Sequence, residues 1–500
     1  MELSFGEIAR MMETAPPSQP NLRATGYSID SRTIQPGELF FAVQGQRLDG
    51  HDFVPAALAA GAAGAVVISS RREDFPAGSQ AKLLGVQNPL EALQRLAAAV
   101  RRRWGGPLVA VTGSAGKTIT KQMIASLLGT RFRVLANEGN LNNHFGLPLS
   151  LLRLQPETEV GVFEMGMSGP GEIRLLAGLA APDVGVVTNV SAVHLEFFSD
   201  VEAIARAKFE LLESLGSHAW AVLNAEDPRV CSFGERFSGR VLYFGFSGPA
   251  HFQAQDLARN GSGGFRFTVP AKPFQAVPPG LSWKSNVSAG KGKVPASGAI
   301  AGATGKESSA ESFHLPLLGR HNVLNLLAAL AACYCFGLPP GSLREAVRSL
   351  RPAPMRGEMI RLANGAMVVN DCYNSNPEAL DAMLASVASL DARRRFAVLG
   401  EMRELGPSSE TLHYRCGQRL GELSFDGLFT VGDGARPFAD GARAAGVRSE
   451  ALAHFASAEE AAQGLQDRWR EGDVVLLKAS RTVHLERVWE VWQRNPLPQR

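Results

Sequence analysis

Short apolar runs recur along this chain from Pro107 onward, and each ends abruptly in glycine or a polar residue. Eight such runs occupy residues 108–111, 160–163, 184–187, 220–223, 367–369, 396–399, 428–431 and 474–477. Continuous β-branched runs of this length are typical of strands buried on both faces of a parallel sheet. The stretches between them, such as 200–215 and 408–420, have helical spacing. The pattern predicts an α/β protein whose strands lead into functional loops.

The arrangement of these runs divides the chain into three segments. We expect a first domain at 1–105, with an extended part at 25–43 and helices at 52–61 and 90–104. A central domain at 106–350 carries the first series of strands, and a C-terminal domain at 351–500 carries the second. Pro352 and Pro354 mark the linker between them. Residues 285–310 are mostly Gly, Ser and Ala, which predicts a flexible surface loop inserted between strands.

Composition and charge restrict the classes of function. The chain has 500 residues, of which 45% are hydrophobic and 20% charged, as in an ordinary soluble protein of two to four domains. A net charge of +3 is too small for general attraction to nucleic acid or an anionic membrane. Any anion must therefore be bound by local geometry, and we expect no nucleic-acid partner.

No targeting or membrane-spanning segment is evident in the sequence. The longest apolar stretches fall short of the ~18 to 20 residues that a bilayer span needs. The first fifteen residues, MELSFGEIARMMETA, lack the basic-then-apolar layout of a signal peptide. Five scattered cysteines without CxxC spacing argue against disulfides and a zinc site. We expect a cytoplasmic protein that is not inserted in a membrane.

The first strand of the central domain leads into a glycine-rich turn that opens a helix. Its residues are Gly113, Ser114, Ala115, Gly116, Lys117 and Thr118. In such a loop the backbone N–H groups and the helix N-terminus bind phosphate oxygens. Lys117 would reach the β- and γ-phosphates of ATP, and the Thr118 hydroxyl would ligate Mg²⁺. The longer phosphate-binding pattern has glycine where Val111 stands, so the alternative is a plain glycine-rich turn.

Oxygen and nitrogen donors follow neighbouring strands of the same series. Glu164 ends one strand and His194 follows another, where they could hold a divalent cation, although Glu164 could also cap a helix and His194 could simply be packed. By its position in a helical stretch, Lys208 reads as a solvated lysine. Asparagines at 137, 140, 142 and 143 could orient a polar ligand or build turns.

An ordered set of motifs covers nearly the whole chain and resembles the ATP-dependent Mur ligases of peptidoglycan synthesis. These motifs lie at 30–53, 111–121, 139–152, 164–173, 188–198, 205–211, 318–329, 355–358, 370–380, 398–406 and 478–486. The family's phosphate loop is TGxxGKT, which accounts for Val111. The resemblance implies three domains: a UDP-sugar-binding domain, a central ATP-binding domain and a Rossmann-like lid.

The resemblance also implies roles for individual residues. Glu164 and His194 take metal roles, and Lys208 matches the family's carbamylated lysine, which replaces the solvated interpretation. Asn322, Asp371 and Arg356 match contacts to adenine, to ribose and to the nucleotide. The residues that match substrate contacts are Ser31, Arg32, Asn142, Asn143, Tyr373 and Asn374. Ile119, Cys372 and the long 285–310 loop depart from the family's usual pattern without touching a proposed ligand.

The segment NDCYNSNP at 370–377 favours one activity within the family. It implies a ligase that uses ATP and Mg²⁺ to join D-Ala-D-Ala to UDP-N-acetylmuramoyl-tripeptide through an acyl phosphate, as a monomer. A sister ligase that adds a single amino acid would carry an Arg-containing DNPR-type motif there. A folylpolyglutamate synthase would lack the first-domain segment. A regulator that uses ATP as a switch is a further alternative, which slow hydrolysis and indifference to D-Ala-D-Ala would reveal.

Overall fold

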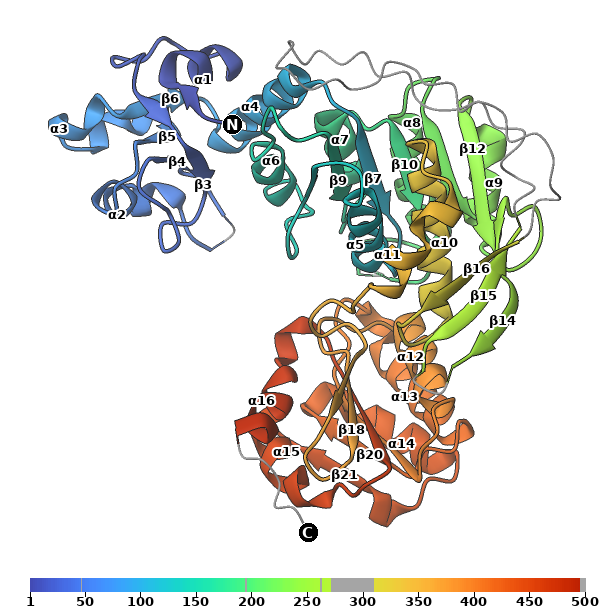
Figure 1. Ribbon diagram of the computed structural model, residues 1–500. Helices are drawn as coiled ribbons and strands as arrows, with labels where there is room; N and C mark the ends of the chain where they lie inside the picture. The colour runs from blue at the N-terminus through green and yellow to red at the C-terminus, as the bar shows by residue number, and fades with distance from the viewer. Residues whose placement is uncertain (46, 194–195, 261–262, 271–309, 495–500) are drawn as a thin grey trace, which may run out of the picture.

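The fold consists of three successive groups of elements, each built around its own sheet, which is wholly or mainly parallel (Figure 1). The computed structural model describes residues 1–494 except 46, 194–195, 261–262 and 271–309. Parallel strands alternate with helices along most of the chain, which confirms the predicted α/β class. The predicted loop at 285–310 lies outside the described residues, except for Ala310.

The N-terminal group is a four-stranded parallel sheet in the order β3-β4-β5-β6. The strands are β3 (Gly26–Ser28), β4 (Glu38–Phe41), β5 (Gly64–Ile68) and β6 (Leu83–Val86). Its helices are α1 (Phe5–Met11), α2 (Val54–Ala59), α3 (Ala77–Gln80) and α4 (Pro89–Trp104). Asn88 caps α4 by accepting from the Leu90 and Glu91 amides, and Gly105 ends it in the left-handed conformation. Helix α4 packs on α6 (Gly146–Leu151) and α7 (Glu172–Ala180), so it joins this group to the next.

The central group is a seven-stranded parallel sheet in the order β13-β12-β11-β10-β7-β9-β8. The strands are β7 (Leu108–Thr112), β8 (Val134–Ala136), β9 (Val160–Glu164), β10 (Val184–Val187), β11 (Trp220–Asn224), β12 (Arg240–Gly245) and β13 (Phe252–Gln253). The remaining helices are α5 (Lys117–Leu128), α8 (Val201–Glu213), α9 (Pro228–Arg236), α10 (Arg320–Cys335) and α11 (Arg344–Arg348).

Alternate residues of the central strands enter two different cores. In β7, Leu108 and Ala110 pack with one cluster, whereas Val109 and Val111 pack with another that includes α5 and α10. Both faces of the sheet are therefore buried, which is why its strands read as continuous apolar runs rather than alternating ones. A smaller antiparallel sheet, β14 (Gln255–Arg259), β15 (Phe265–Val269) and β16 (Glu311–Leu315), extends from this group.

The C-terminal group is a six-stranded sheet in the order β17-β18-β22-β19-β20-β21, parallel except for β17. The strands are β17 (Glu358–Arg361), β18 (Met367–Asn370), β19 (Arg394–Gly400), β20 (Gly427–Val431), β21 (Leu452–Phe455) and β22 (Asp473–Lys478). Its helices are α12 (Pro377–Ala388), α13 (Ser409–Glu422), α14 (Arg436–Ala444), α15 (Ala458–Leu465) and α16 (Glu486–Arg494). All eight apolar runs are strands, so that part of the prediction is confirmed.

Among the described residues, no single helix combines the length and the apolar composition of a membrane span. Helix α10 and the segment Pro340–Arg348 do so only as a pair, which is bent by 117° at the break between them.

Candidate nucleotide-binding site

The register of three central strands brings the expected donors to one edge of the sheet. Strand β7 lies between β9 and β10, with Val111 opposite Glu164 and Thr112 opposite Val187. After β7 the chain forms β8 and β9 on one side of β7 and then crosses over to form β10 on the other side. In open α/β sheets, ligands bind beyond the carboxyl ends of the strands at such a change of direction. The loop after β7 is therefore at the position that the fold favours for a ligand.

The loop between β7 and α5 depends on two glycines. Gly113 has φ +149° and Gly116 has φ +80°, in the region that side chains disfavour. A Cβ on Gly113 would lie 1.8 Å from the Thr188 Oγ1 atom. The side-chain oxygen of Asn189 accepts from the amides of Ser114 and Ala115 at 3.0 and 2.8 Å. The loop therefore holds its shape through contacts with the residues that follow β10.

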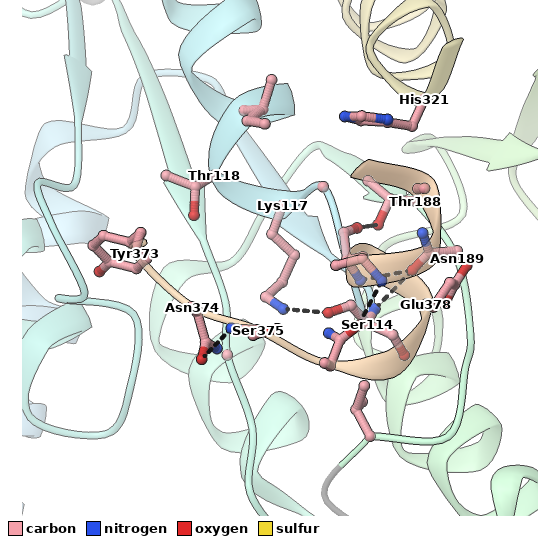
Figure 2. A pocket seen from close by; sticks show the side chains of 18 of the residues that line it. Ser114, Lys117, Thr118, Thr188, Asn189, His321, Tyr373, Asn374, Ser375 and Glu378 are labelled. Atoms are coloured by element: carbon pink, nitrogen blue, oxygen red, sulfur yellow. Dashed lines mark hydrogen bonds between the residues drawn. The ribbon is translucent and has the colours of Figure 1, made fainter. Parts of the chain in front are cut away.

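Lys117 and Thr118 begin α5 and face the space above the loop (Figure 2). The Lys117 ammonium donates to the carbonyls of Gly113 and Ser114 at 2.8 and 3.3 Å. Burial lowers the pKa of Lys117, and the Glu164 carboxylate opposes this shift. The N-cap residue of α5 is Gly116, which has no side chain to cap the helix, so the first N–H groups of α5 can bind an anion.

Glu164 is the last residue of β9 and is almost completely buried. Its Oε2 atom accepts from the Thr118 hydroxyl at 2.7 Å, and its Oε1 atom accepts from the Asn142 side-chain amide at 2.7 Å. Thr118 and Glu164 thus place two oxygen atoms that could ligate a metal side by side. Asn143, in contrast, accepts from the amides of Phe145 and Gly146 and builds the turn before α6.

Lys208 is buried inside α8, which excludes the solvated position that its helix pattern suggested. Burial, together with the nearby Lys117 charge, lowers the pKa of Lys208 well below its usual value. No hydrogen bond or ion pair joins its ammonium to another residue in the described part of the chain. His194 lies outside the described residues.

The C-terminal group contributes a second wall. Arg356 donates to the Thr118 hydroxyl at 3.1 Å, and its guanidinium lies 4.0 Å from the centre of the Tyr373 ring. Asp371 follows β18 and forms a buried ion pair with Lys478, the last residue of β22, at 2.5 Å. The Lys478 ammonium also donates to the Asn374 carbonyl at 2.9 Å. Through Arg356, the C-terminal group therefore contacts Thr118 of the central group.

A cleft of about 880 Å³ lies between these walls. Most of the residues that the sequence singled out line it: Ser114, Ala115, Gly116, Lys117, Thr118, Asn142, Asn143, Glu164, Arg356, Asp371, Tyr373 and Asn374. Tyr373, Asn374 and Glu378 of the C-terminal group line the same cleft as Ser114 and Lys117 (Figure 2). The cleft thus joins the phosphate loop to the C-terminal group.

Five of the described residues that the sequence predicted for the site do not line the cleft, and the buried Lys208 is one of them. Gly113 forms the base of the loop without lining the cleft. Ser31 and Arg32 follow β3 in the N-terminal group, and the Arg32 guanidinium is exposed and pairs with Asp30 at 2.6 Å. Asn322, on α10, borders a second cavity of about 340 Å³ under the linker, where its side chain donates to the Leu318 carbonyl at 2.7 Å.

Several residues that line the cleft were missed by sequence reasoning. They include Asn189, His321, Asn325 and Lys478. Asn189 carried a usable signal, because it is the second of two polar residues, Thr188 and Asn189, that follow an apolar run. Asn325 lies one helical turn after Asn322 and donates to its side chain at 3.0 Å. Lys478 carried a similar signal, because it directly follows the apolar run 474–477. His321 gave no separate signal, since its position depends on how α10 packs.

The donors at the cleft fit Mg²⁺, which prefers oxygen ligands and binds through one or two carboxylates together with substrate phosphates. Thr118 and Glu164 supply such oxygens beside the phosphate loop. Among the described residues no group of three or more His, Cys, Asp and Glu could hold a metal by itself. The arrangement therefore suits a metal that arrives with a phosphate ligand.

Three family models match successive parts of the chain. The catalytic domain of the Mur ligase family matches residues 23–101, the Mur ligase middle domain 111–333, and the glutamate ligase domain of Mur ligases 355–481. The UDP-N-acetylmuramoyl-tripeptide–D-alanyl-D-alanine ligase of Bacillus subtilis is 33% identical over 473 residues, 94% of each chain.

Two solved structures resemble the whole molecule. MurF ligase from Thermotoga maritima in complex with ADP has a TM-score of 0.75 and 29% identity, and the match covers 94% of this chain and 97% of that one. MurF from Acinetobacter baumannii has a TM-score of 0.80 with 98% of both chains covered; at 24% identity this match supports the fold alone.

Proposed function

Because this chain belongs to the Mur ligase family, we propose that it joins D-Ala-D-Ala to UDP-N-acetylmuramoyl-tripeptide and converts ATP to ADP and phosphate. The observation that carries the proposal is the cleft that the phosphate loop shares with the C-terminal group, where Arg356 reaches Thr118. The relatives named for this activity match nearly the full length, which supports it over a ligase with another acceptor.

The chemistry requires activation of a carboxylate. The terminal carboxylate of the tripeptide attacks the γ-phosphorus of ATP, ADP leaves, and an acyl phosphate forms. The D-Ala-D-Ala amine then attacks the acyl carbon, the C–O bond to phosphate breaks, and the nitrogen loses a proton. Two anions must approach each other in the first step, so positive charge at the γ-phosphate is essential.

The chain's own residues supply the positive charge and the enclosure. Lys117 and the open N-terminus of α5 hold the phosphates, while Arg356 adds a second cation from the C-terminal group. Thr118 and Glu164, with His194 as a further candidate, would hold Mg²⁺, which neutralises charge on the phosphates when bound. Asp371 and Asn322 are proposed for the ribose and the adenine.

Lys208 is proposed to carry a carbamate. The reaction with CO₂ requires a neutral amine, and the lowered pKa of Lys208 favours that form. The product is an anion, which Lys117 and a bound metal would stabilise. In the active enzyme, ¹³CO₂ labelling should give one carbamate carbon signal that Lys208→Arg abolishes. A bare amine in the active, Mg²⁺-bound enzyme would exclude this part of the proposal.

The remaining expectations follow the same scheme. Residues 1–105, with Ser31 and Arg32, are proposed to bind the UDP-sugar, residues 106–350 to bind ATP, and residues 351–500 to act as a lid. Asn142, Asn143, Tyr373 and Asn374 are proposed to contact substrate. We propose that the enzyme is monomeric and cytoplasmic.

Product analysis tests the proposed reaction. ADP release should require both UDP-N-acetylmuramoyl-tripeptide and D-Ala-D-Ala, and mass spectrometry should find the pentapeptide product. Lys117→Ala should lower the rate by about 10²-fold or more, because a γ-phosphate contact is lost. Rapid ADP release without the dipeptide, or equal turnover with a single amino acid, would contradict the assignment.

A further inference from the structure

Asn137 holds the main chain of Glu164 from both sides. Asn137 directly follows β8, and its side-chain oxygen accepts from the Glu164 amide at 2.9 Å. Its side-chain nitrogen donates to the carbonyls of Glu164 and Leu141 at 3.0 and 2.8 Å. Asn137 is 2% exposed, so these bonds are shielded from bulk solvent. The amide therefore fixes both peptide groups that flank the Glu164 side chain.

Lys121 in turn holds Asn137. It lies on α5 one helical turn after Lys117, is 3% exposed, and donates from its ammonium to the Asn137 carbonyl at 2.5 Å. Burial lowers the pKa of Lys121, and the charge of Glu164 opposes that shift. A buried cation costs free energy that an apolar side chain of similar shape would not, so its presence calls for a compensating role.

These contacts form a closed path behind the site. Helix α5 carries Thr118 at the cleft and Lys121 at its back; Lys121 holds Asn137, and Asn137 holds the Glu164 backbone. The path closes where the Thr118 hydroxyl meets the Glu164 carboxylate at 2.7 Å. We infer that Lys121 and Asn137 are positioning residues, which fix the Thr118 and Glu164 oxygens at the separation that a Mg²⁺–nucleotide complex requires. This inference rests on the proposed function.

Some residues do not touch a metal but hydrogen-bond to its ligands and orient them. Mutating such a residue usually lowers metal affinity by about 10- to 100-fold. The test measures ADP affinity by calorimetry, once with excess Mg²⁺ and once with EDTA. The quantity compared is the ratio of ADP affinity in Mg²⁺ to ADP affinity in EDTA. In Lys121→Met and in Asn137→Asp this ratio should be smaller than in the unaltered chain by about tenfold or more. ADP affinity in EDTA should stay within about twofold, because neither side chain lines the cleft.

Arg101→Met is a matched control for the loss of a buried cation. Arg101 is 6% exposed and donates to the carbonyls of Ala180 and Ala181 at 2.6 and 2.9 Å, away from the cleft. This variant should lose thermal stability yet keep the full Mg²⁺ effect. If Lys121→Met and Asn137→Asp behave in the same way, their role is structural only and the inference is wrong.

Misfolding of a variant and failure of the proposed function can both be told apart from failure of the inference. If Lys121→Met does not fold, Asn137→Asp, which keeps the side chain's volume and removes its N–H donors, decides the question. If Mg²⁺ does not strengthen ADP binding in the unaltered chain, the metal part of the proposed function fails, and the inference fails with it.

Discussion

Burial keeps the His321 ring uncharged at the cleft. Its Nδ1 atom has no hydrogen-bond partner among the described residues, and burial lowers the pKa of His321 to about 4. Between pH 4 and 6.5 the unfolded chain therefore binds a proton that the folded chain does not. The His321 contribution to the free energy of unfolding rises with pH across this window and is lost as the pH falls.

Denaturant titrations at several pH values measure this effect of His321. The unaltered chain should gain stability with pH between 4 and 6.5 more steeply than His321→Asn, by up to about 1.4 kcal/mol per pH unit. Carboxylates titrate in the same range in both chains, so the difference in slope isolates the histidine. Parallel slopes would mean that the ring binds protons equally in the folded and the unfolded chain, which would contradict the lowered pKa.

At the scale of elements, the turn from β7 to α5 tolerates no side chain at Gly113. Because a Cβ there would overlap the Thr188 hydroxyl at 1.8 Å, Gly113→Ala should displace the loop and lower the free energy of unfolding by about 2 kcal/mol or more. ADP binding by calorimetry should be lost with it. Gly178→Ala, in α7 with open space around the added Cβ, should be neutral or stabilising by up to about 1 kcal/mol. Equal effects at both sites would contradict the steric argument.

The pairing of β15 with β16 makes a second prediction at the same scale. These strands are antiparallel, and Val269 lies opposite Glu311, so a short turn can join them. Replacing residues 271–309 with a Gly- and Asn-containing turn should leave ADP release within about threefold and the melting temperature nearly unchanged. A severe loss of either would show that the removed residues contact the enzyme.

At the scale of the whole molecule, one cleft is divided between two groups of elements. The phosphate loop lies before the linker at 352–354, whereas Arg356, Asp371 and Tyr373 lie after it. A ligand that contacts both walls favours the arrangement in which they are close. Saturating a sample with ATP analogue and UDP-sugar substrate should therefore decrease its radius of gyration in small-angle scattering.

Arg356→Gln is the informative variant for this closure. It should weaken ATP binding by about tenfold, since a charge-assisted contact to the nucleotide side of the cleft is lost, and it should reduce the compaction. Asp371→Ala is less suitable, because it would leave the buried Lys478 charge without its partner. An unchanged radius of gyration in a sample shown to be saturated would exclude closure.

Local features were sufficient to predict much of this molecule. The eight apolar runs, the glycine turn and the polar residue after each strand determined the strands and the loop, because these depend on neighbours within a few residues. The proximity of Glu164 and Thr118 could be predicted on that basis, since parallel strands place their carboxyl ends at one edge.

Only the tertiary structure decided the rest, because burial and pairing involve residues far apart in sequence. Lys208 reads as solvated in its helix, yet packing encloses it and lowers its pKa. The contact of Arg356 with Thr118 spans 238 positions, and Lys478 and Asp371 are 107 apart. Asn137 and Asn143 look alike in sequence, but one holds Glu164 and the other builds a turn. Which role an amide takes depends on the groups that the fold brings beside it.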